Sequence, residues 1–203
     1  MAQGILFVVS APSGAGKTTL VRKVIEQLPG VNLSVSYTTR APRPEEQEGI
    51  DYCFITRDEF NAMEREGKFI EWAHVHGDLY GTPRANMVKL QQGEDLVLEI
   101  DTQGARKIRE ELRNGVLIFI RPPSLEVLHE RLQIRGGDSE EAMQARLHNA
   151  QKELDQMDWY DYIVVNDDIE EATRQLASIF IAERCKTARV LMRIGGGDGT
   201  DNG

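Results

Sequence analysis

Short apolar runs alternate along the chain with longer segments in which apolar residues recur at helical spacing. The first run, residues 5–9, is rich in β-favouring side chains and predicts a strand that is buried on both faces. A glycine-bearing turn over residues 10–16 follows it. Residues 17–28 then have the apolar spacing of a helix, which Pro29 and Gly30 end. The amino-terminal unit is therefore expected to be a strand, a glycine loop and a helix.

The same alternation returns in the second half of the chain. Apolar runs predict strands at residues 96–100, 116–120 and 162–165. Helical spacing predicts helices near residues 103–113, after Pro122 and Pro123, from about 139 to 157, and over 169–186. Strands that alternate with helices indicate an α/β fold with a central parallel sheet flanked by helices.

Residues 33–89 break this rhythm and are expected to form an inserted lobe. They contain β-like pieces at 33–37, 51–55 and 69–75, and a helix announced by a capping box from Thr56 to Glu59. Thr82 and Pro83 predict the start of a helix that runs to about Gln92. The expected division is a core of residues 1–32 and 90–194, a lobe of residues 33–89, and a disordered glycine-rich tail over residues 195–203.

Charge and composition limit the classes of function. The 203 residues include 33 acidic and 24 basic side chains, for a net charge of −9, so the chain is expected to be repelled by nucleic acid and anionic membranes. An anionic ligand would need a local cluster of cations. No apolar run approaches the roughly 20 residues that cross a bilayer. With only Cys53 and Cys185 no disulfide framework is expected, which favours the cytoplasm.

Residues 11–18, APSGAGKT, match the phosphate-binding pattern G-x-x-x-x-G-K-[ST] except at Ala11. Glycines at 14 and 16 let backbone N–H groups approach phosphate oxygens at a helix start. Lys17 would reach the β and γ phosphates, and Thr18 would ligate Mg²⁺. The alternative is a tightly packed turn without a ligand. The expected ATP-binding residues of this loop are Ala11, Pro12, Ser13, Gly14, Ala15, Gly16, Lys17, Thr18 and Thr19.

Two arginines, Arg40 and Arg43, stand three apart in a segment that prolines hold extended. In an acidic chain they are a candidate anion clamp, because guanidinium groups grip phosphate with paired, charge-assisted hydrogen bonds. Tyr52 and Tyr80 are candidate hydroxyl donors beside them. The alternative is a pair of solvated surface arginines.

Several segments together resemble guanylate kinase, in order and at the expected spacing from about residue 4 to 186. They are APSGAGKT at 11–18, SYTTRAPR at 36–43, FIEW at 69–72, YGT at 80–82, LEIDTQG at 98–104, RPPS at 121–124, the arginines from Arg131 to Arg146, and VNDD at 165–168. The resemblance implies a P-loop kinase with a nucleoside-monophosphate lobe and a lid, placed here at residues 125–150. It also implies transfer of the γ-phosphoryl group of ATP to GMP, and to dGMP, with Mg²⁺.

The resemblance also implies roles for individual residues. Those expected to bind GMP are Ser36, Arg40, Arg43, Tyr52, Glu71, Tyr80, Thr82 and Asp101. Asn166 and Asp167 would hold the adenine side of ATP. The residues expected to act on the transferring phosphoryl group are Lys17, Arg40, Arg131, Arg135 and Arg146. Glu99 stands where the family often has an aspartate near the hydrated metal, so any link between Glu99 and Mg²⁺ would pass through water.

The chemistry of guanine independently favours Glu71 and Asp101 as its partners. Guanine presents N1–H and an amino group on one edge, and carboxylates only accept hydrogen bonds, whereas adenine has an acceptor at N1. The alternatives are a surface glutamate at position 71 and a helix cap at position 101. Asp101 follows a predicted parallel strand, where ligand groups gather in open α/β sheets.

Two other functions compete with the kinase reading. One is a scaffold domain of the same fold that binds phosphorylated partners, which the intact Gly14, Gly16, Lys17 and Thr18 disfavour. The other is a kinase with a different acceptor, which Glu71, Thr82 and Asp101 disfavour. The sequence leaves homo-oligomerisation open.

Overall fold

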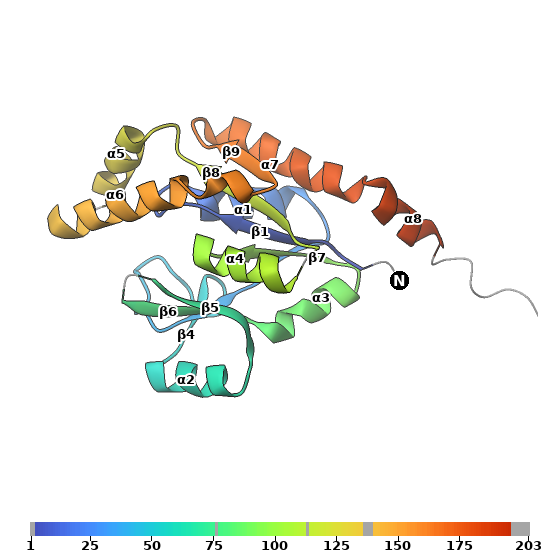
Figure 1. Ribbon diagram of the computed structural model, residues 1–203, viewed down its shortest axis with the longest axis horizontal. Helices are drawn as coiled ribbons and strands as arrows, with labels where there is room; N and C mark the ends of the chain where they lie inside the picture. Colours follow the sequence, from blue (N-terminus) through green and yellow to red (C-terminus); the bar gives the residue numbers. More distant parts are fainter. Residues whose placement is uncertain (1–2, 76, 113, 136–139, 196–203) are drawn as a thin grey trace, which may run out of the picture.

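A computed structural model of the protein describes residues 3–75, 77–112, 114–135 and 140–195, and Figure 1 shows its arrangement. The core is a sheet with the strand order β2-β7-β1-β8-β9, in which every pair is parallel. Its strands are β1 (Leu6–Ser10), β2 (Val31–Leu33), β7 (Asp95–Glu99), β8 (Val116–Arg121) and β9 (Tyr162–Val165). The predicted parallel α/β core is confirmed.

Helices cover both faces of this sheet because the side chains of each strand alternate between them. Phe7 and Val9 of β1 pack on one face with the helices α1 and α7, whereas Leu6 and Val8 pack on the other with α3 and α4. Phe7 stacks on Phe180 with ring centroids 3.7 Å apart. Burying one such side chain contributes about 1.5–3 kcal/mol. These helices are α1 (Lys17–Gln27), α3 (Val88–Gln91), α4 (Thr102–Glu111) and α7 (Ile169–Arg184).

The register between β1 and β7 sets the position of the site. Val9 lies opposite Glu99, and both strands run in the same direction. The chain therefore leaves both strands at the same edge of the sheet. The glycine loop after β1 and the residues after β7, including Asp101, come together there, where open α/β sheets bind their ligands.

A second sheet, with the order β4-β3-β6-β5, forms the body of the lobe. β3 pairs in parallel with β4, and β6 pairs antiparallel with both β3 and β5. The helix α2 begins at the predicted capping box, in which Thr56 and Glu59 bond reciprocally, and Phe60 packs against Phe69 and Leu79. The elements are β3 (Ser36–Thr38), β4 (Tyr52–Phe54), α2 (Arg57–Arg65), β5 (Phe69–Val75) and β6 (Asp78–Pro83).

The β-like piece predicted over residues 33–37 is two strands in different sheets. Leu33 pairs with Val97 in the core, whereas Ser36 pairs with Tyr52 in the lobe. Ser34 between them is buried and accepts a hydrogen bond of 2.9 Å from the amide of Asn86. Periodicity did not reveal the change of sheet, because both halves are extended.

The helix predicted to begin at Thr82 starts later, so that prediction was wrong. Thr82 and Pro83 are the last residues of β6, and a 3-10 turn, η1 (Arg84–Met87), precedes α3. Pro83 is extended, and no side chain caps η1. The Thr82 hydroxyl instead donates a hydrogen bond to the carboxylate of Glu71 on β5.

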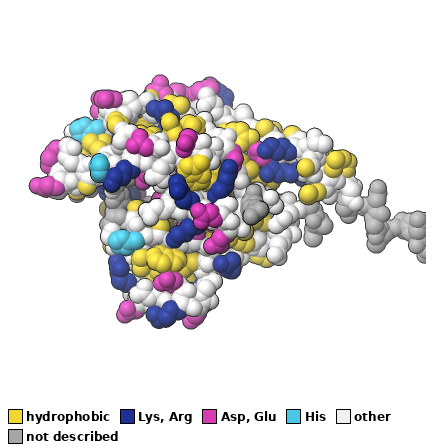
Figure 2. All heavy atoms as spheres, viewed as in Figure 1, with side chains coloured by type: hydrophobic (Ala, Val, Ile, Leu, Met, Phe, Trp, Pro, Cys, Tyr) yellow, Lys and Arg dark blue, Asp and Glu magenta, His cyan; other side chains and the backbone are white. Residues whose placement is uncertain are grey.

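The carboxyl-terminal half also contains α5 (Leu125–Arg135), α6 (Glu140–Leu154), a short turn η2 (Met157–Trp159) and α8 (Thr187–Gly195). The first two match the helices predicted around the lid. A separate α8 was not predicted; it extends beyond the core in Figure 1, and Figure 2 shows apolar side chains at that end of the molecule. Among the described residues, no helix combines the length and apolarity that a bilayer crossing requires. Most of the expected tail, residues 196–203, lies outside the described residues.

Candidate active site

The loop between β1 and α1 has the backbone geometry of an anion cradle. Gly14 and Gly16 have φ values of 88° and 90°, a region that favours glycine. The N–H of Ala15 donates to the carbonyl of Pro12 at 3.1 Å, which closes the turn. Gly16 occupies the N-cap of α1 and supplies no side-chain cap. The first N–H groups of α1 therefore face the loop, where the helix dipole favours an anion.

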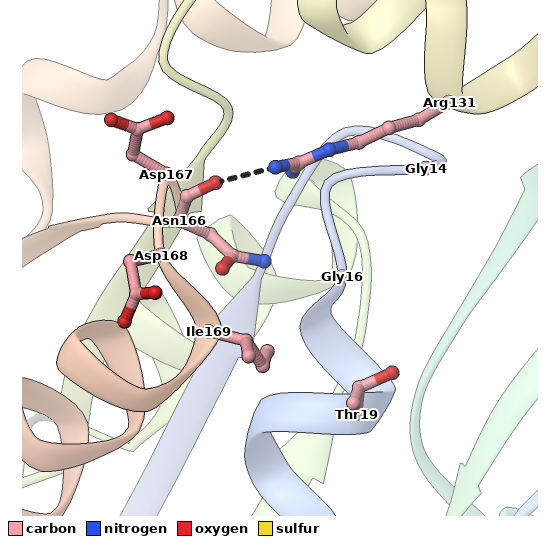
Figure 3. A pocket seen from close by; sticks show the side chains of 8 residues that line it. All are labelled: Gly14, Gly16, Thr19, Arg131, Asn166, Asp167, Asp168 and Ile169. Atoms are coloured by element: carbon pink, nitrogen blue, oxygen red, sulfur yellow. Dashed lines mark hydrogen bonds between the residues drawn. The ribbon is translucent and has the colours of Figure 1, made fainter.

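Asn166, at the end of β9, packs directly on this loop. Its side-chain amide donates to the carbonyl of Ala15 at 2.7 Å, and Asn166 is 4% exposed. Its own carbonyl accepts a hydrogen bond of 3.0 Å from Arg131 of α5. Figure 3 shows Arg131 reaching across from α5 toward Asn166. The structure thus joins a predicted lid arginine, a predicted ATP-binding residue and the loop.

These residues line a hollow of about 390 Å³ over the loop (Figure 3). Its walls come from three parts of the chain that are distant in sequence. The lining residues are Gly14, Gly16, Thr19, Arg131, Asn166, Asp167, Asp168 and Ile169. Asp168 caps α7 by accepting from the N–H of Glu171 at 2.7 Å. The hollow is polar where the loop and the 166–168 turn meet, as a nucleotide site requires.

Lys17 and Thr18, the first residues of α1, face the end of β7. The Thr18 hydroxyl donates to one carboxylate oxygen of Glu99 at 3.0 Å. The other oxygen of Glu99 is buried without a hydrogen-bond partner. Lys17 donates to the carbonyl of Ile100 at 3.4 Å. An oxygen-rich site that a hydrated cation completes fits this hydroxyl and this carboxylate. The described residues contain no group of three or more His, Cys, Asp or Glu side chains placed to hold a metal by themselves.

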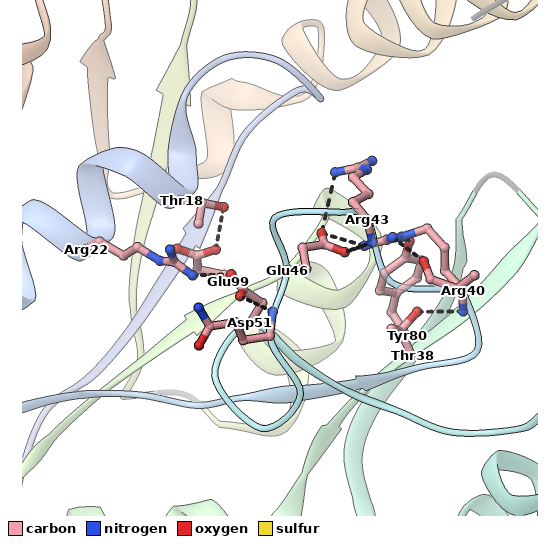
Figure 4. A network of polar contacts seen from close by, with 11 residues as sticks. Thr18, Arg22, Thr38, Arg40, Arg43, Glu46, Asp51, Tyr80 and Glu99 are labelled. Carbon is pink, nitrogen blue, oxygen red and sulfur yellow. Dashed lines mark hydrogen bonds and ion pairs between the residues drawn. The ribbon is translucent and has the colours of Figure 1, made fainter. Parts of the chain in front are cut away.

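The predicted anion clamp is a network within the lobe (Figure 4). Arg40 donates to both carboxylate oxygens of Glu46, at 2.8 and 2.9 Å, and to the Tyr80 hydroxyl at 3.2 Å. The backbone N–H of Arg43 also donates to Glu46, at 2.8 Å. Burial by itself would raise the pKa of Glu46, but these hydrogen bonds hold that pKa below its usual value. The Arg43 guanidinium lies 3.7 Å from Oε1 of Glu46, so neither arginine is simply solvated.

The clamp and the phosphate loop face each other. Tyr52 lies edge-on to Tyr80 with ring centroids 5.8 Å apart, and the Arg40 guanidinium lies 5.7 Å from the centre of the Tyr52 ring. Burial, together with the negative charge of Glu99, raises the pKa of Tyr52 to about 12. Tyr52 thus lies in the field of the carboxylate that bonds Thr18. Ser36, also predicted here, is buried at the start of β3.

Among the ion pairs between described residues, one joins the core to the part of the lobe that carries the clamp. Arg22 of α1 pairs with Asp51, and the N–H of Gln47 donates to the other oxygen of Asp51 at 2.8 Å (Figure 4). Neither Asp51 nor Glu46 was singled out in the sequence. Both are acids next to a predicted clamp, which is the only local signal they give.

The two predicted base-reading residues come from different parts of the protein, Glu71 from the lobe and Asp101 from the core. Glu71 of β5 is 6% exposed, and its Oε1 accepts a hydrogen bond of 2.5 Å from Thr82. Asp101 caps α4 through the N–H of Gly104, at 2.9 Å. A Cβ on Gly104 would lie 2.6 Å from Oε2 of Glu71, so the absence of a side chain lets the carboxylate pack against α4.

The environment of Glu71 is unusual for an acid. Burial, opposed by the hydrogen bond from Thr82 and assisted by the charge of the neighbouring Asp101, raises its pKa to about 7. The interpretation of Glu71 as a surface glutamate was therefore wrong. Asp101 is a helix cap, as the alternative interpretation held, and its second oxygen accepts from Gln103 at 3.1 Å.

The remaining lid residues are only partly described. Arg146 lies on α6, which packs against α5 through an apolar cluster that includes Leu128, Leu132 and Met143. Arg135 ends α5, but its side chain lies outside the described residues, as do Gly136 and Gly137. The structure therefore brings Arg131 to the loop and leaves the contacts of Arg135 undefined.

The fold and this geometry define a class of protein, a P-loop kinase with a separate acceptor lobe. The family model for guanylate kinase matches residues 3–183. The guanylate kinases of Geobacter sulfurreducens and Syntrophomonas wolfei are 50% and 48% identical to this chain, over 93% and 94% of it and 94% and 98% of their own lengths. The crystal structure of guanylate kinase from Anaplasma phagocytophilum is 39% identical, with a TM-score of 0.77 over 93% of this chain and 90% of that one. The chain belongs to the guanylate kinase family and is an ATP:GMP phosphotransferase.

Because Asn166 lies so close to the loop, a side chain added at position 16 is expected to disturb the loop. A Cβ there would lie 2.3 Å from Nδ2 of Asn166. We expect Gly16→Ala to lower Tm and to abolish ATP binding, measured by circular dichroism and titration calorimetry. Gly67→Ala is the control, because Gly67 also has a positive φ but no heavy atom lies within 4 Å of the added carbon, so only about 1–2 kcal/mol of backbone strain is expected. Equal losses in both variants would contradict the contact.

Proposed function

We propose that this chain transfers the γ-phosphoryl group of ATP to GMP, and also to dGMP, with Mg²⁺ bound to the ATP. The observation that supports it most is the arrangement of the arginine clamp opposite the phosphate loop, with Tyr52 in the field of Glu99. One anion site for the donor and one for the acceptor are what phosphoryl transfer between two nucleotides needs. We propose the cytoplasm as its compartment, where reduced thiols such as the unpaired Cys53 and Cys185 persist.

On the donor side, backbone N–H groups of the phosphate loop hold the ATP phosphates, and the Lys17 ammonium neutralises their charge. Asn166 and Asp167 border the hollow at the adenosine end. The Thr18 hydroxyl would hold Mg²⁺, and Glu99 would do so through water, which fits the unpartnered oxygen of Glu99. The cation, when bound, draws charge from the phosphate oxygens.

On the acceptor side, the clamp holds the GMP phosphate through Arg40, Arg43 and the hydroxyls of Ser36, Tyr52 and Tyr80. Glu71 and Asp101 accept hydrogen bonds from N1–H and the amino group of guanine, and Thr82 fixes the Glu71 carboxylate. A site whose buried acceptors would stay unpaired with adenine can discriminate by about 10⁴–10⁵.

The transfer step needs no covalent intermediate on the protein. An oxygen of the GMP phosphate attacks the γ-phosphorus, and the bond from that phosphorus to the β–γ bridging oxygen breaks to leave ADP. The protein aligns the two phosphates and neutralises charge on the transferring group, the roles that we propose for Lys17, Arg40, Arg131, Arg135 and Arg146. Closure of the lid keeps water from acting as the acceptor.

A panel of acceptors tests the proposed function directly. ADP release is measured with ATP, Mg²⁺ and each of GMP, dGMP, AMP, UMP, CMP and dTMP. We expect turnover with GMP and dGMP only. Silence with every acceptor would instead support a binding scaffold, and preference for another acceptor would show that the base assignment is wrong.

Replacing Glu71 tests the reading of guanine. We expect Glu71→Gln to lower the selectivity for GMP over AMP by about 100-fold or more, because the amide also donates to the N1 acceptor of adenine. The control is Glu66→Gln, an exposed glutamate at the end of α2 in the same lobe, which should leave selectivity unchanged. Unchanged selectivity in Glu71→Gln would contradict the assignment.

The raised pKa of Glu71 allows a second test, which measures the protons released when GMP binds. The free group, with a pKa of about 7, is mostly protonated at pH 6, and the guanine N1–H favours the ionised form. GMP binding at pH 6 should therefore release protons, an effect that fades above about pH 8. Calorimetry in buffers of different ionisation enthalpy measures this release, which should diminish in Glu71→Gln.

Lid arginines should affect the rate more than acceptor binding. We expect Arg135→Ala and Arg146→Ala each to lower kcat by about 10³ or more, with little change in GMP affinity, because such cations stabilise charge in the transition state. Arg174→Ala, an exposed arginine of α7, is the control. Equal losses of kcat and GMP affinity would contradict a role in the chemical step.

A further inference from the structure

The carboxyl-terminal end of α6 brings a third acid to the base end of the acceptor site. Leu154, the last residue of α6, packs in the same apolar cluster as Ile70 and Ile100. Each of these apolar residues adjoins an acid in the chain. Those acids are Glu153, Glu71 and Asp101, respectively. Packing in this cluster thus puts the end of α6 on the same face of the core sheet as the segments that carry the two proposed base-reading residues.

The carboxyl group of Glu153 lacks a donor for one of its oxygens. Oε2 is buried and has no hydrogen-bond partner in the structure. Burial and, to a lesser extent, the charge of Asp101 raise the pKa of Glu153 to about 7 against the opposing charge of Lys17. A buried acceptor without a partner is costly and rare in folded proteins, unless water or a ligand satisfies it. Glu153 is therefore an acceptor available to a substrate.

The chemistry of GMP limits which of its groups can donate a hydrogen bond to Glu153. Its base donors, N1–H and the amino group, face Glu71 and Asp101 in the proposed function. Its phosphate is an anion, which a carboxylate repels. The remaining donors are the ribose hydroxyls, which lie between base and phosphate. Glu153 interacts electrostatically with Asp101 at the base end and with Lys17 on the path of the phosphoryl group. That is where the sugar of a bound GMP must lie.

We propose that Glu153 is a specificity-determining residue whose buried carboxylate oxygen accepts a hydrogen bond from a ribose hydroxyl of GMP. The inference rests on the proposed function and assigns recognition of the sugar to α6. Acidic side chains accept from ribose hydroxyls at other nucleotide sites for the same reason, since a carboxylate has only acceptors to offer. Because α6 also carries Arg146, sugar recognition and lid position are linked through one helix.

The test compares GMP, dGMP and 3′-deoxy-GMP as acceptors of the full chain and of its Glu153→Ala variant. In the wild type we expect the analogue that lacks the bonded hydroxyl to have a kcat/KM about 10- to 100-fold below that of GMP, the effect of one hydrogen bond to a charged group. In Glu153→Ala this preference should fall to about one, because GMP loses the bond and that analogue does not. Titration calorimetry with the same nucleotides should show the same ratio in Kd.

Two further variants serve as a control and as a replacement for Glu153→Ala. Asp155→Ala, the same kind of truncation at an exposed acid just beyond α6, should keep the wild-type preference. If Glu153→Ala fails to fold by circular dichroism, Glu153→Gln replaces it. Its neutral amide oxygen still accepts, so the preference should fall to a few-fold.

The outcomes separate this inference from the function on which it rests. Failure of the wild type to phosphorylate GMP would overturn both. Wild-type turnover of GMP with no preference between the sugars would overturn this inference alone. So would a variant that loses activity equally with all three nucleotides, since Glu153 would then act through Lys17 or through the fold.

Discussion

The parallel pairing of β1 with β7 is the constraint on which the rest of the structure depends. It places Val9 opposite Glu99, so that the phosphate loop and the Glu99–Asp101 segment leave the sheet at one edge. The hydrogen bond from Thr18 to Glu99 and the contact of Lys17 with Ile100 follow from this register. A slip of one residue would turn the alternating side chains of β1 to the wrong faces, and the apolar packing on both faces opposes it.

The lobe is held to the core at both ends of the proposed acceptor site. At the phosphate end, Arg22 of α1 pairs with Asp51. At the base end, Lys107 of α4 donates to the carbonyl of Trp72 and lies 5.0 Å from the centre of its ring. An exposed ion pair contributes little to stability, but it can favour one lobe position over another. These contacts connect α1, which follows the phosphate loop, and α4, which follows Asp101, to the lobe that is proposed to hold the acceptor.

Acidic side chains organise the cations of this acidic chain. Glu46 orients Arg40 by accepting two hydrogen bonds, and its low pKa keeps it charged. Without Glu46 the two guanidinium groups would repel each other as they converge. The opposite arrangement holds at the base end, where Glu71 is buried beside Asp101 and its pKa is raised. The proposed site is thus cationic where a phosphate would lie and rich in acceptors where a base would lie.

Local signals in the sequence determined the core elements, the phosphate loop and the capped helix α2. Apolar periodicity, glycine conformation and side-chain capping act over a few residues, so they are visible without a fold. The same logic failed at Thr82, whose hydroxyl suits an N-cap but bonds Glu71 on the neighbouring strand. Local signals also did not indicate that Glu46, Asp51 or Glu153 belong to the site. The partners of those acids are set by the folding of the lobe and by the packing of α6 on the core. Only the tertiary structure could decide them, because burial and long-range contacts, rather than local spacing, fix which acids meet which donors.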